Sequence, residues 1–389
     1  MLEKLTTYRR ALHQIPELGA DLPKTKAFLE GVLRPLPCKL FYPGGDALCA
    51  FFDAGKEDTI AFRSDMDALP ICEKNALPFC SRHPNAMHAC GHDGHMAILL
   101  CLAEYLAEHF RALPHNVLLV FQPAEETTGG AKDICESGIF EQLNARCIFG
   151  LHLWPSLPPG VIATRSGALM ARSCELTIEI QGKSAHIARQ EDGIDALFAG
   201  VEFIRRAYEM AALPSQGECP LLRFGRMQSG TARNAISAHT RLEGTLRTFS
   251  DDLHASLQQG LLALSKTLEQ QTGCQFQLHF SDGYPPVIND PLLFGEVSRY
   301  LGKENLLELE KPTLITEDFS FYQQRLPGVF FFLGIGGDQP LHSDLLPDPS
   351  LHWDQSALLP LPLPPPAHKG SAHRRLLNEP CRSLPAGLH

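Results

Sequence analysis

Short, nearly continuous apolar runs recur through the N-terminal part of the chain. They lie at residues 47–53, 59–64, 117–121 and 147–151. Runs of this length are typical of strands that are buried on both faces. Residues 95–110 place apolar side chains on a helical period, which predicts a helix packed against these strands. The alternation predicts an α/β fold with a mixed, largely parallel sheet flanked by helices.

The pattern changes near Gly167. The segments CELTIEIQG (174–182) and TRLEGTLRTF (240–249) alternate apolar and polar residues, which predicts antiparallel strands with one face in water. Helical stretches near 193–212 and 251–271 accompany them. These elements predict a second, α+β domain.

The apolar run VFFFLG at 329–334 again has the composition of a fully buried strand, and it follows a Gly- and Pro-containing segment at 283–290 that resembles a linker. We therefore expect the chain to return to its first domain. The predicted domains are residues 1–166 together with 288–344, and an insertion at 167–287.

Prolines accumulate after the last predicted strand. Residues 345–389 hold nine of the 30 prolines, including the run LPLPPP. Proline fits neither the interior of a helix nor a central strand, so we expect this tail to be disordered or polyproline-like. A proline-rich ligand for an aromatic groove is the alternative.

Charge and cysteine usage narrow the class of protein. The chain has 44 acidic and 34 basic residues and a net charge of -10, which disfavours nucleic acid as a partner. No signal peptide and no apolar run of about 18 residues is evident, so we expect no membrane contact and a cytoplasmic location. The twelve cysteines are scattered and form no Cys-x-x-Cys pair, which fits reduced thiols and disfavours a thiol-based redox enzyme.

The segment MHACGHDGHMA at 87–97 concentrates side chains that can bind metals. Cys90 and His92 flank Gly91 just before the predicted helix, so both can reach one ion or two adjacent ions from a single loop. His88 and His95 are the expected bystanders. A buried free cysteine beside surface histidines is the alternative.

Two adjacent carboxylates, Glu125 and Glu126, follow the predicted strand 117–121. The carboxyl ends of strands in open α/β sheets are where sites form. One carboxylate there can bind metal while the other faces a water molecule, which is the arrangement that metal-assisted hydrolysis needs. Two solvated acids in a loop are the alternative.

Single histidines follow two more predicted strands. His152 ends the segment CIFGLHLWP, and His342 lies in GGDQPLHSD. Either alone is more often structural than a ligand. Their placement after strands, together with the two groups above, favours a shared metal site.

Nine segments in this order resemble the M20 metallopeptidase superfamily, and specifically its amidohydrolase branch, which includes N-acyl-amino-acid amidohydrolases, hippurate hydrolases, auxin-conjugate hydrolases and N-acetyldiaminopimelate deacetylases. The segments are FRSDMDALP, MHACGHDGHMA, FQPAEE, GLHLWP, GKSAHIA, TARNAIS, LEGTLRTF, TEDFS and LHSD. The resemblance runs from about residue 5 to 344. It implies a catalytic α/β domain interrupted by an α+β lid and dimerisation domain.

The resemblance also implies a two-ion site, with a general base that later acts as acid, Glu125, and five ligands: Cys90, His92, Glu126, His152 and His342. Most of the superfamily has an aspartate in place of Cys90, and a cysteine resembles the amidohydrolase branch. The divalent ions can be zinc, manganese, cobalt or nickel, and thiolate with imidazole favours zinc. The resemblance does not assign each ligand to one ion.

Four further residues match family positions. Asp67 resembles a carboxylate that orients a metal ligand from behind, and a loop-capping aspartate is the alternative. His186 resembles a histidine that stabilises the oxyanion and can come from a partner subunit. Asn234 and Arg247 match positions that bind the substrate's carboxylate or acyl oxygen. Each of these three can instead be an ordinary polar residue of a strand.

The activity that the resemblance implies is hydrolysis of the amide bond of an N-acyl amino acid, a small-molecule substrate, by an enzyme that can form a homodimer through the inserted domain. A dipeptidase or carboxypeptidase of the same superfamily is the nearest alternative. The family continues after LHSD into a closing amphipathic helix, whereas this chain continues into prolines, and an altered reading frame is one hypothesis for the difference. A catalytically silent metal-binding protein is therefore a further alternative.

Overall fold

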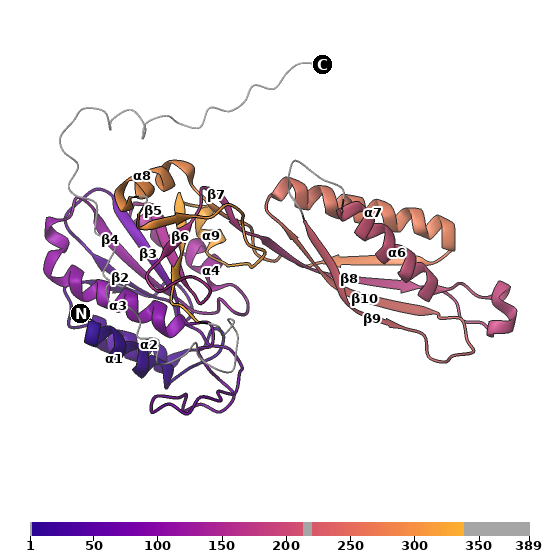
Figure 1. Cartoon of the computed structure of the whole chain (residues 1–389), viewed down its shortest axis with the longest axis horizontal. Coiled ribbons are helices and arrows are strands. Elements are labelled where there is room, and N and C mark those ends of the chain that lie inside the picture. The colour runs from indigo at the N-terminus through magenta and orange to yellow at the C-terminus, as the bar shows by residue number, and fades with distance from the viewer. Residues whose placement is uncertain (1, 213–219, 303, 338–389) are drawn as a thin grey trace, which may run out of the picture.

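Two large β-sheets, joined by a narrow pair of connections, make up most of the described structure (Figure 1), and a small two-stranded sheet lies where the connections begin. The computed structural model describes residues 2–212, 220–302 and 304–337. The predicted tail and His342 lie outside these residues.

The larger sheet has eight strands in the order β1-β2-β4-β3-β5-β14-β6-β13. Its central strands β4, β3, β5 and β14 run parallel, whereas β1 and β2 are antiparallel on one side and β6 is antiparallel to β14 on the other. The α/β prediction is thereby confirmed. Its strands are β1 (Lys39–Phe41), β2 (Leu48–Phe52), β3 (Thr59–Asp65), β4 (Asn116–Gln122), β5 (Ala145–Trp154), β6 (Ile162–Thr164), β13 (Leu306–Glu308) and β14 (Gly328–Gly334).

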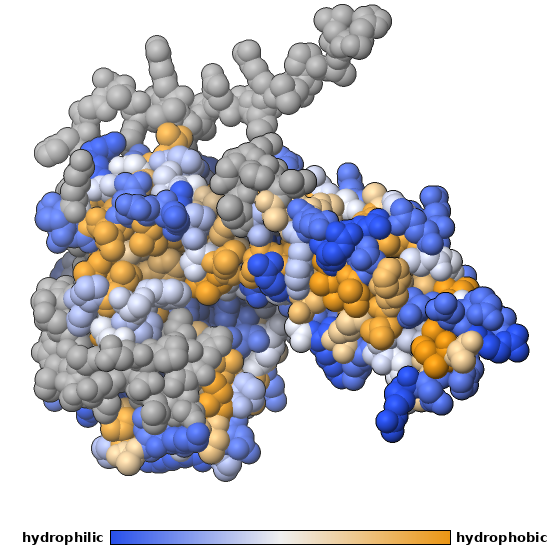
Figure 2. Space-filling model, turned by 45° about the vertical axis from the view of Figure 1, so that its right-hand side comes forward, coloured by the Kyte–Doolittle hydropathy of each residue, from blue (hydrophilic) through white to orange (hydrophobic). Residues whose placement is uncertain are grey.

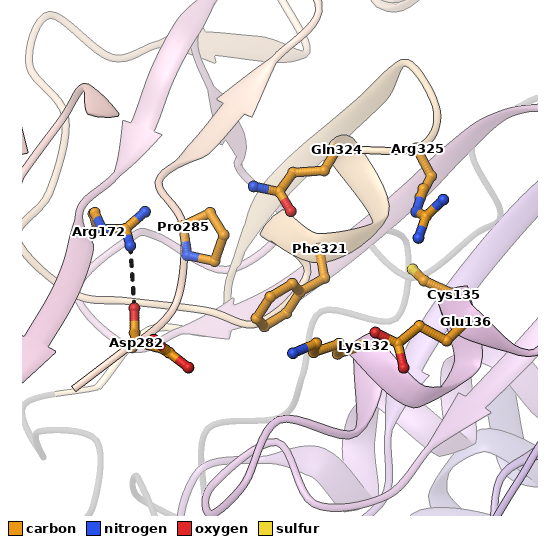
Figure 3. Close-up of a pocket in the computed structure, with 10 residues that line it drawn as sticks. Lys132, Cys135, Glu136, Arg172, Asp282, Pro285, Phe321, Gln324 and Arg325 are labelled. Carbon is orange, nitrogen blue, oxygen red and sulfur yellow. Dashed lines mark hydrogen bonds between the residues drawn. The ribbon is translucent and has the colours of Figure 1, made fainter. Parts of the chain in front are cut away.

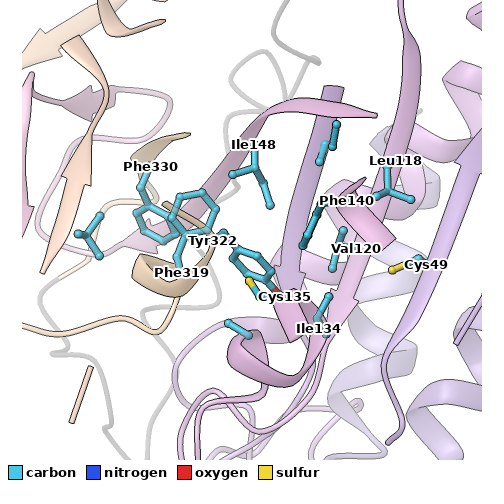
Figure 4. Packing of buried hydrophobic residues seen from close by; sticks show 14 of the residues in the cluster. Cys49, Leu118, Val120, Ile134, Cys135, Phe140, Ile148, Phe319, Tyr322 and Phe330 are labelled. Atoms are coloured by element: carbon cyan, nitrogen blue, oxygen red, sulfur yellow. The ribbon is translucent and has the colours of Figure 1, made fainter. Parts of the chain in front are cut away.

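Helices cover both faces of this sheet, and β4 shows why its strands have no polar face. Leu118 and Val120 point into one core cluster, which Figure 4 shows, while Leu119 and Phe121 point into the cluster on the other face. Successive side chains of a strand alternate between faces, so a strand buried on both must be apolar throughout. The flanking helices are α1 (Leu2–His13), α2 (Pro23–Leu33), α3 (His92–His109), η1 (Phe110–Ala112), α4 (Gly130–Glu136), α5 (Ile139–Gln142), α8 (Pro291–Leu301) and α9 (Ser320–Gln323).

The second sheet is antiparallel, with the order β11-β8-β10-β9. Two helices cover one face of it, and each is preceded by a residue whose side chain accepts hydrogen bonds from the first turn of the helix, Asp195 and Ser250. The other face is open to water, which explains the alternating sequence pattern. We call this unit, residues 172–280, the inserted sheet region. Its elements are β8 (Arg172–Gln181), η2 (Ile187–Asp192), α6 (Ala196–Ala211), β9 (Leu221–Ser229), β10 (His239–Thr248), α7 (Asp251–Thr272) and β11 (Gln275–Phe280).

A two-stranded sheet marks the root of both connections. β7 (Gly167–Met170) pairs with β12 (Val287–Asn289), and Met170 and Val287 pack in the core of the larger sheet. The segment 283–290, expected as a linker, is therefore a strand in part. The domain boundaries at 166/167 and 287/288 remain predictions.

Two further features concern the cysteines and the helices. No disulfide bond links any of the ten cysteines within the described ranges. Among the described helices, none combines the length and the apolar character required to cross a bilayer.

Candidate metal centre

The centre forms at the edge of the larger sheet where its parallel strands end. β3 pairs in parallel with both β4 and β5, so the carboxyl ends of all three lie together. β3 ends at Asp65, β4 leads into the loop that carries Glu125 and Glu126, and β5 carries His152 near its end. Residues far apart in sequence thus meet at one edge, where α/β sheets form their sites.

The turn before α3 supplies the next two side chains. Gly91 has a φ of 91°, a left-handed conformation that favours glycine, and a Cβ there would lie 3.2 Å from Leu153 Cδ1. The turn places Cys90 just before the helix and His92 at its first residue. Both side chains are buried.

Cys90, His92 and His152 each offer an atom within 4.8 Å of the others. The Cys90 sulfur lies 3.3 Å from His152 Nε2, and His92 Nε2 lies 3.7 Å from a carboxylate oxygen of Glu126. A second group of this kind joins His92 to Glu125 and Glu126. The structure therefore brings together four of the five predicted ligands, and the fifth, His342, lies outside the described residues.

Asp67 holds the Glu125 loop, which we define as residues 123–129, through its carboxylate. Its two oxygens accept hydrogen bonds from the backbone N–H groups of Glu125 and Glu126, each at 3.0 Å. Its backbone carbonyl lies 2.9 Å from His92 Nδ1. Asp67 thus fixes the loop and also contacts His92, a predicted ligand. Its contacts suit both predicted roles, that of an aspartate that caps a loop and that of one that orients a metal ligand.

His95, expected as a bystander, is buried in the centre itself. Its Nδ1 lies 2.6 Å from Asp65 Oδ1, and its Nε2 accepts the backbone N–H of Leu153 at 2.9 Å. Its ring centroid is 4.6 Å from that of His152. The sequence did hold a signal for this position: His95 follows His92 by three residues, and residues three apart share a helix face.

A buried ion network lies behind Glu125, and sequence reasoning gave its members no role. Arg63 contacts three carboxylates, those of Asp65 at 2.8 Å, Glu317 at 2.9 Å and Asp318 at 2.8 Å. The signal for it was a charged residue inside an apolar strand, TIAFRSD, because a buried charge requires partners. Glu317 and Asp318 belong to the TEDFS segment.

Burial and neighbouring charges set the protonation of the predicted ligands. Burial, with Glu126 and Glu125 nearby, raises the pKa of the Cys90 thiol well above its usual range. Burial and the neighbouring His95 lower the pKa of His152 well below its ordinary value. Burial alone would lower the pKa of His92, but Asp65, Asp67 and Glu126 raise it to about 10.

Glu125 differs from an ordinary surface carboxyl. Burial raises its pKa well above the usual range, and the carboxylates of Glu317 and Asp318 raise it further. Each of the three offers an oxygen within 4.8 Å of the other two. A carboxyl of raised pKa in a buried site has the property that a proton-transfer group at neutral pH requires.

The donor set suits a divalent cation. His92 Nε2 is buried and has no hydrogen-bond partner among the described residues, which is costly unless some other group satisfies it. A thiolate, imidazoles and carboxylates around that nitrogen are ligand types that zinc and related ions use. The residues present therefore fit a metal ion.

The three candidates of the inserted sheet region lie at its opposite ends. Arg247 pairs with Ser173 at the end of the sheet near the connections, whereas His239 of the same strand pairs with Gln181 at the other end. His186 and Asn234 lie beyond that far end, linked by a bridge at Ala235 and by the N–H of Ile187 donating to the Asn234 carbonyl. A ten-residue strand spans roughly 30 Å, so one chain does not place His186 at the metal centre.

Comparison with known proteins identifies the family. Residues 61–355 match the model of peptidase family M20/M25/M40. The chain is 34% identical to a Streptococcus uberis protein named N-acetyldiaminopimelate deacetylase, over 87% of this chain and 92% of that one.

Solved structures are also similar. A putative aminohydrolase from methicillin-resistant Staphylococcus aureus has a TM-score of 0.84 and 28% identity, with 92% of this chain and 96% of that one covered. A Bacillus subtilis protein described as a dinuclear metal-binding peptidase of the M20 family has a TM-score of 0.79 and 28% identity, over 92% and 94% of the two chains. The chain belongs to peptidase family M20/M25/M40 and is a metal-dependent hydrolase.

Proposed function

We propose that this hydrolase cleaves the amide bond of N-acyl amino acids. The observation that carries the proposal is the convergence of Cys90, His92, His152 and Glu126 beside a buried carboxyl, Glu125, of raised pKa. The likeness to a protein named as a deacetylase supports an acyl substrate. The likeness to a protein described as a peptidase makes cleavage of dipeptides or of a C-terminal residue the second candidate.

We propose that two divalent ions, zinc, manganese, cobalt or nickel, are held by Cys90, His92, Glu126, His152 and His342. The mixed sulfur and nitrogen donors favour zinc. When bound, such ions acidify a water molecule and polarise the carbonyl of the scissile amide.

The chain's own residues move the protons and hold the substrate. Glu125, in its ionised form, takes a proton from the attacking water and then delivers that proton to the leaving amine. Arg247 suits the substrate carboxylate because its planar fork matches both oxygens. Asn234 and His186 lie too far from the centre of their own chain, so they contribute hydrogen bonds to the acyl oxygen and to the oxyanion, respectively, at the site of a partner subunit.

We further propose a homodimer through the inserted sheet region. β9 is an edge strand of that sheet, and α6 exposes three apolar side chains, Leu197, Phe198 and Val201, at 45%, 57% and 48%. Figure 2 shows apolar surface on this region among polar side chains. A partner seated there covers the apolar surface and the strand edge, and it offers a route for its His186 to reach the metal centre of this chain.

A substrate panel tests the proposal. The purified protein is loaded with each candidate ion in turn and assayed on N-acetyl amino acids, N-benzoyl amino acids and dipeptides, with metal content measured in parallel. Turnover of the acyl amino acids above that of the dipeptides supports the proposal. The reverse order favours the peptidase, and bound metal without turnover of any substrate indicates a silent metal-binding protein.

A further inference from the structure

One side chain, Tyr284, joins the hinge between the two sheets to the Glu125 loop. Tyr284 lies on the connection that returns from β11 to β12. Its hydroxyl donates a hydrogen bond to the backbone carbonyl of Glu125 at 2.9 Å and lies 3.5 Å from the carbonyl of Thr127. Burial raises the pKa of Tyr284, so the hydroxyl stays protonated and remains a donor.

The ring of Tyr284 also packs against the loop. Gly129 has a φ of 82°, and a Cβ at this position would lie 2.8 Å from Tyr284 Cε1. Glycine suits this position for two reasons: the positive φ favours it, and any side chain would clash with the tyrosine ring. On the catalytic side, Phe321 of α9 meets the ring edge to face, with centroids 6.0 Å apart.

The backbone of Tyr284 is fixed to the outgoing connection. Its N–H donates to Ser173 Oγ at 3.0 Å, and the N–H of Ser173 donates to the Tyr284 carbonyl at 3.0 Å. The preceding Gly283 has a φ of 57°, and a Cβ there would lie 1.8 Å from the Ser173 carbonyl oxygen. Both connections are therefore locked together at Tyr284, which must move with them.

A cavity of about 340 Å³ lies beside this junction. Figure 3 shows its two sides: Arg172, Asp282 and Pro285 come from the connections, whereas Lys132 and Phe321 come from helices of the larger sheet. Open space thus separates the connections from α4 and α9 at this point. The outgoing connection is also fixed to the catalytic side by the N–H of Ala171, which lies within hydrogen-bond distance of the carbonyls of Thr313 and Ile315, whereas Tyr284 is the hinge residue that contacts the Glu125 loop.

We infer that Tyr284 is a positioning residue that couples the orientation of the inserted sheet region to the placement of the Glu125 carboxyl. The Glu125 backbone is held on its N–H side by Asp67 and on its carbonyl side by Tyr284. Rotation at the hinge displaces the second of these contacts and leaves the first in place. The inference rests on the proposed role of Glu125 as base.

The test is Tyr284→Phe, which removes the hydroxyl and keeps the ring. We expect kcat to fall roughly tenfold, the rate equivalent of about one hydrogen bond to the loop, while KM and metal content stay at the wild-type values. Gly129→Ala disturbs the same contact from the loop side and should lower kcat in the same way. Tyr208→Phe is the matched control, because the Tyr208 hydroxyl accepts the backbone N–H of Phe224 within the inserted sheet region.

Two outcomes overturn the inference. The first is a Tyr284→Phe enzyme with wild-type kcat, and the second is a loss of kcat that is matched by loss of metal or by an equal loss in Tyr208→Phe, which would indicate general structural damage. Glu125→Gln separates this test from the proposed function. If Glu125→Gln retains turnover, the proposed base is wrong; if it is inactive while Tyr284→Phe is unaffected, only the role of Tyr284 fails.

Discussion

The sulfur of Cys90 lies 3.3 Å from Nε2 of His152, although 62 residues separate them in the chain. The contact exists because the turn before α3 and the end of β5 meet at one edge of the sheet. Neither group is charged in a site without metal, since burial raises the pKa of Cys90 and lowers that of His152. A thiol and an imidazole in this position are groups that suit a metal cation.

Replacement of Cys90 by serine should weaken metal retention. A serine hydroxyl is a far poorer ligand than a thiolate, and the loss should be at least about tenfold in affinity, because mutation of residues that only support ligands already costs about 10- to 100-fold. Metal content after dialysis measures it. Cys101→Ser in α3, the helix that follows Cys90, is the control, and equal metal content in the two variants would contradict a ligand role for Cys90.

Glu125→Gln should keep the bound metal and abolish turnover. The amide has nearly the same shape but cannot accept and return a proton, so kcat should fall by about 100-fold or more. Assay of the variant together with metal analysis checks both halves of the prediction. Turnover near the wild-type rate would assign the base to another residue.

Metal affinity should rise with pH. The pKa of Cys90 is raised well above its usual range and that of His92 is raised to about 10, so both side chains hold protons at neutral pH when no cation is bound. A cation must displace these protons, and fewer remain to be displaced as the pH increases. Competition with a chelating dye at about pH 6.5 and about pH 8.5 should show tighter binding at the higher pH. Equal affinities would mean that neither proton is released.

Protonated His13 should contribute to the free energy of unfolding of the metal-free protein. Its Nδ1 lies 2.8 Å from Asp93 and its Nε2 lies 3.3 Å from Glu73. Burial opposes charge on His13, but these carboxylates prevail and raise its pKa from 6.5 to about 9. The folded state thus favours the proton, and the stabilisation is fully present below pH 6.5 and is lost as the pH rises through about 9.

Urea unfolding of the metal-free protein across this pH range measures the contribution of His13 to the free energy of unfolding. The wild type should lose up to a few kcal/mol of unfolding free energy between about pH 6.5 and 9, and His13→Gln should lose less. His109→Gln, an exposed histidine of α3, is the matched control. Parallel pH profiles for the wild type and His13→Gln would rule out a charged His13.

Mixing two inactive variants should restore activity if His186 acts across a dimer. In a heterodimer of Glu125→Gln and His186→Ala, one of the two sites combines an intact Glu125 with an intact His186 from the other subunit. Random pairing of equal amounts makes about half of the dimers heterodimers, so we expect about one quarter of wild-type activity. No recovery in mixtures that demonstrably exchange subunits would place His186 in another role.

The chain's local patterns predicted much of the architecture. Apolar runs predicted β2, β3, β4, β5 and β14, because a strand buried on both faces is apolar throughout. Alternating segments predicted β8 and β10, because a strand buried on one face alternates apolar and polar residues. The ordered motifs identified the family, which the comparisons confirmed. The individual roles of the site residues, the domain boundaries and the dimer remain predictions.

Partners that lie far apart in the chain were decided only by the tertiary structure. Sequence spacing did not reveal that Arg63 would meet Asp318, 255 residues away, that His95 would bond Asp65, or that Tyr284 would reach Glu125. Each contact depends on the order in which strands join the sheet, a global choice that no local pattern encodes. The sequence by itself determined which chemical groups were available and on which elements they lie, and the sheet's topology determined which of them meet, because parallel strands bring distant residues to one edge.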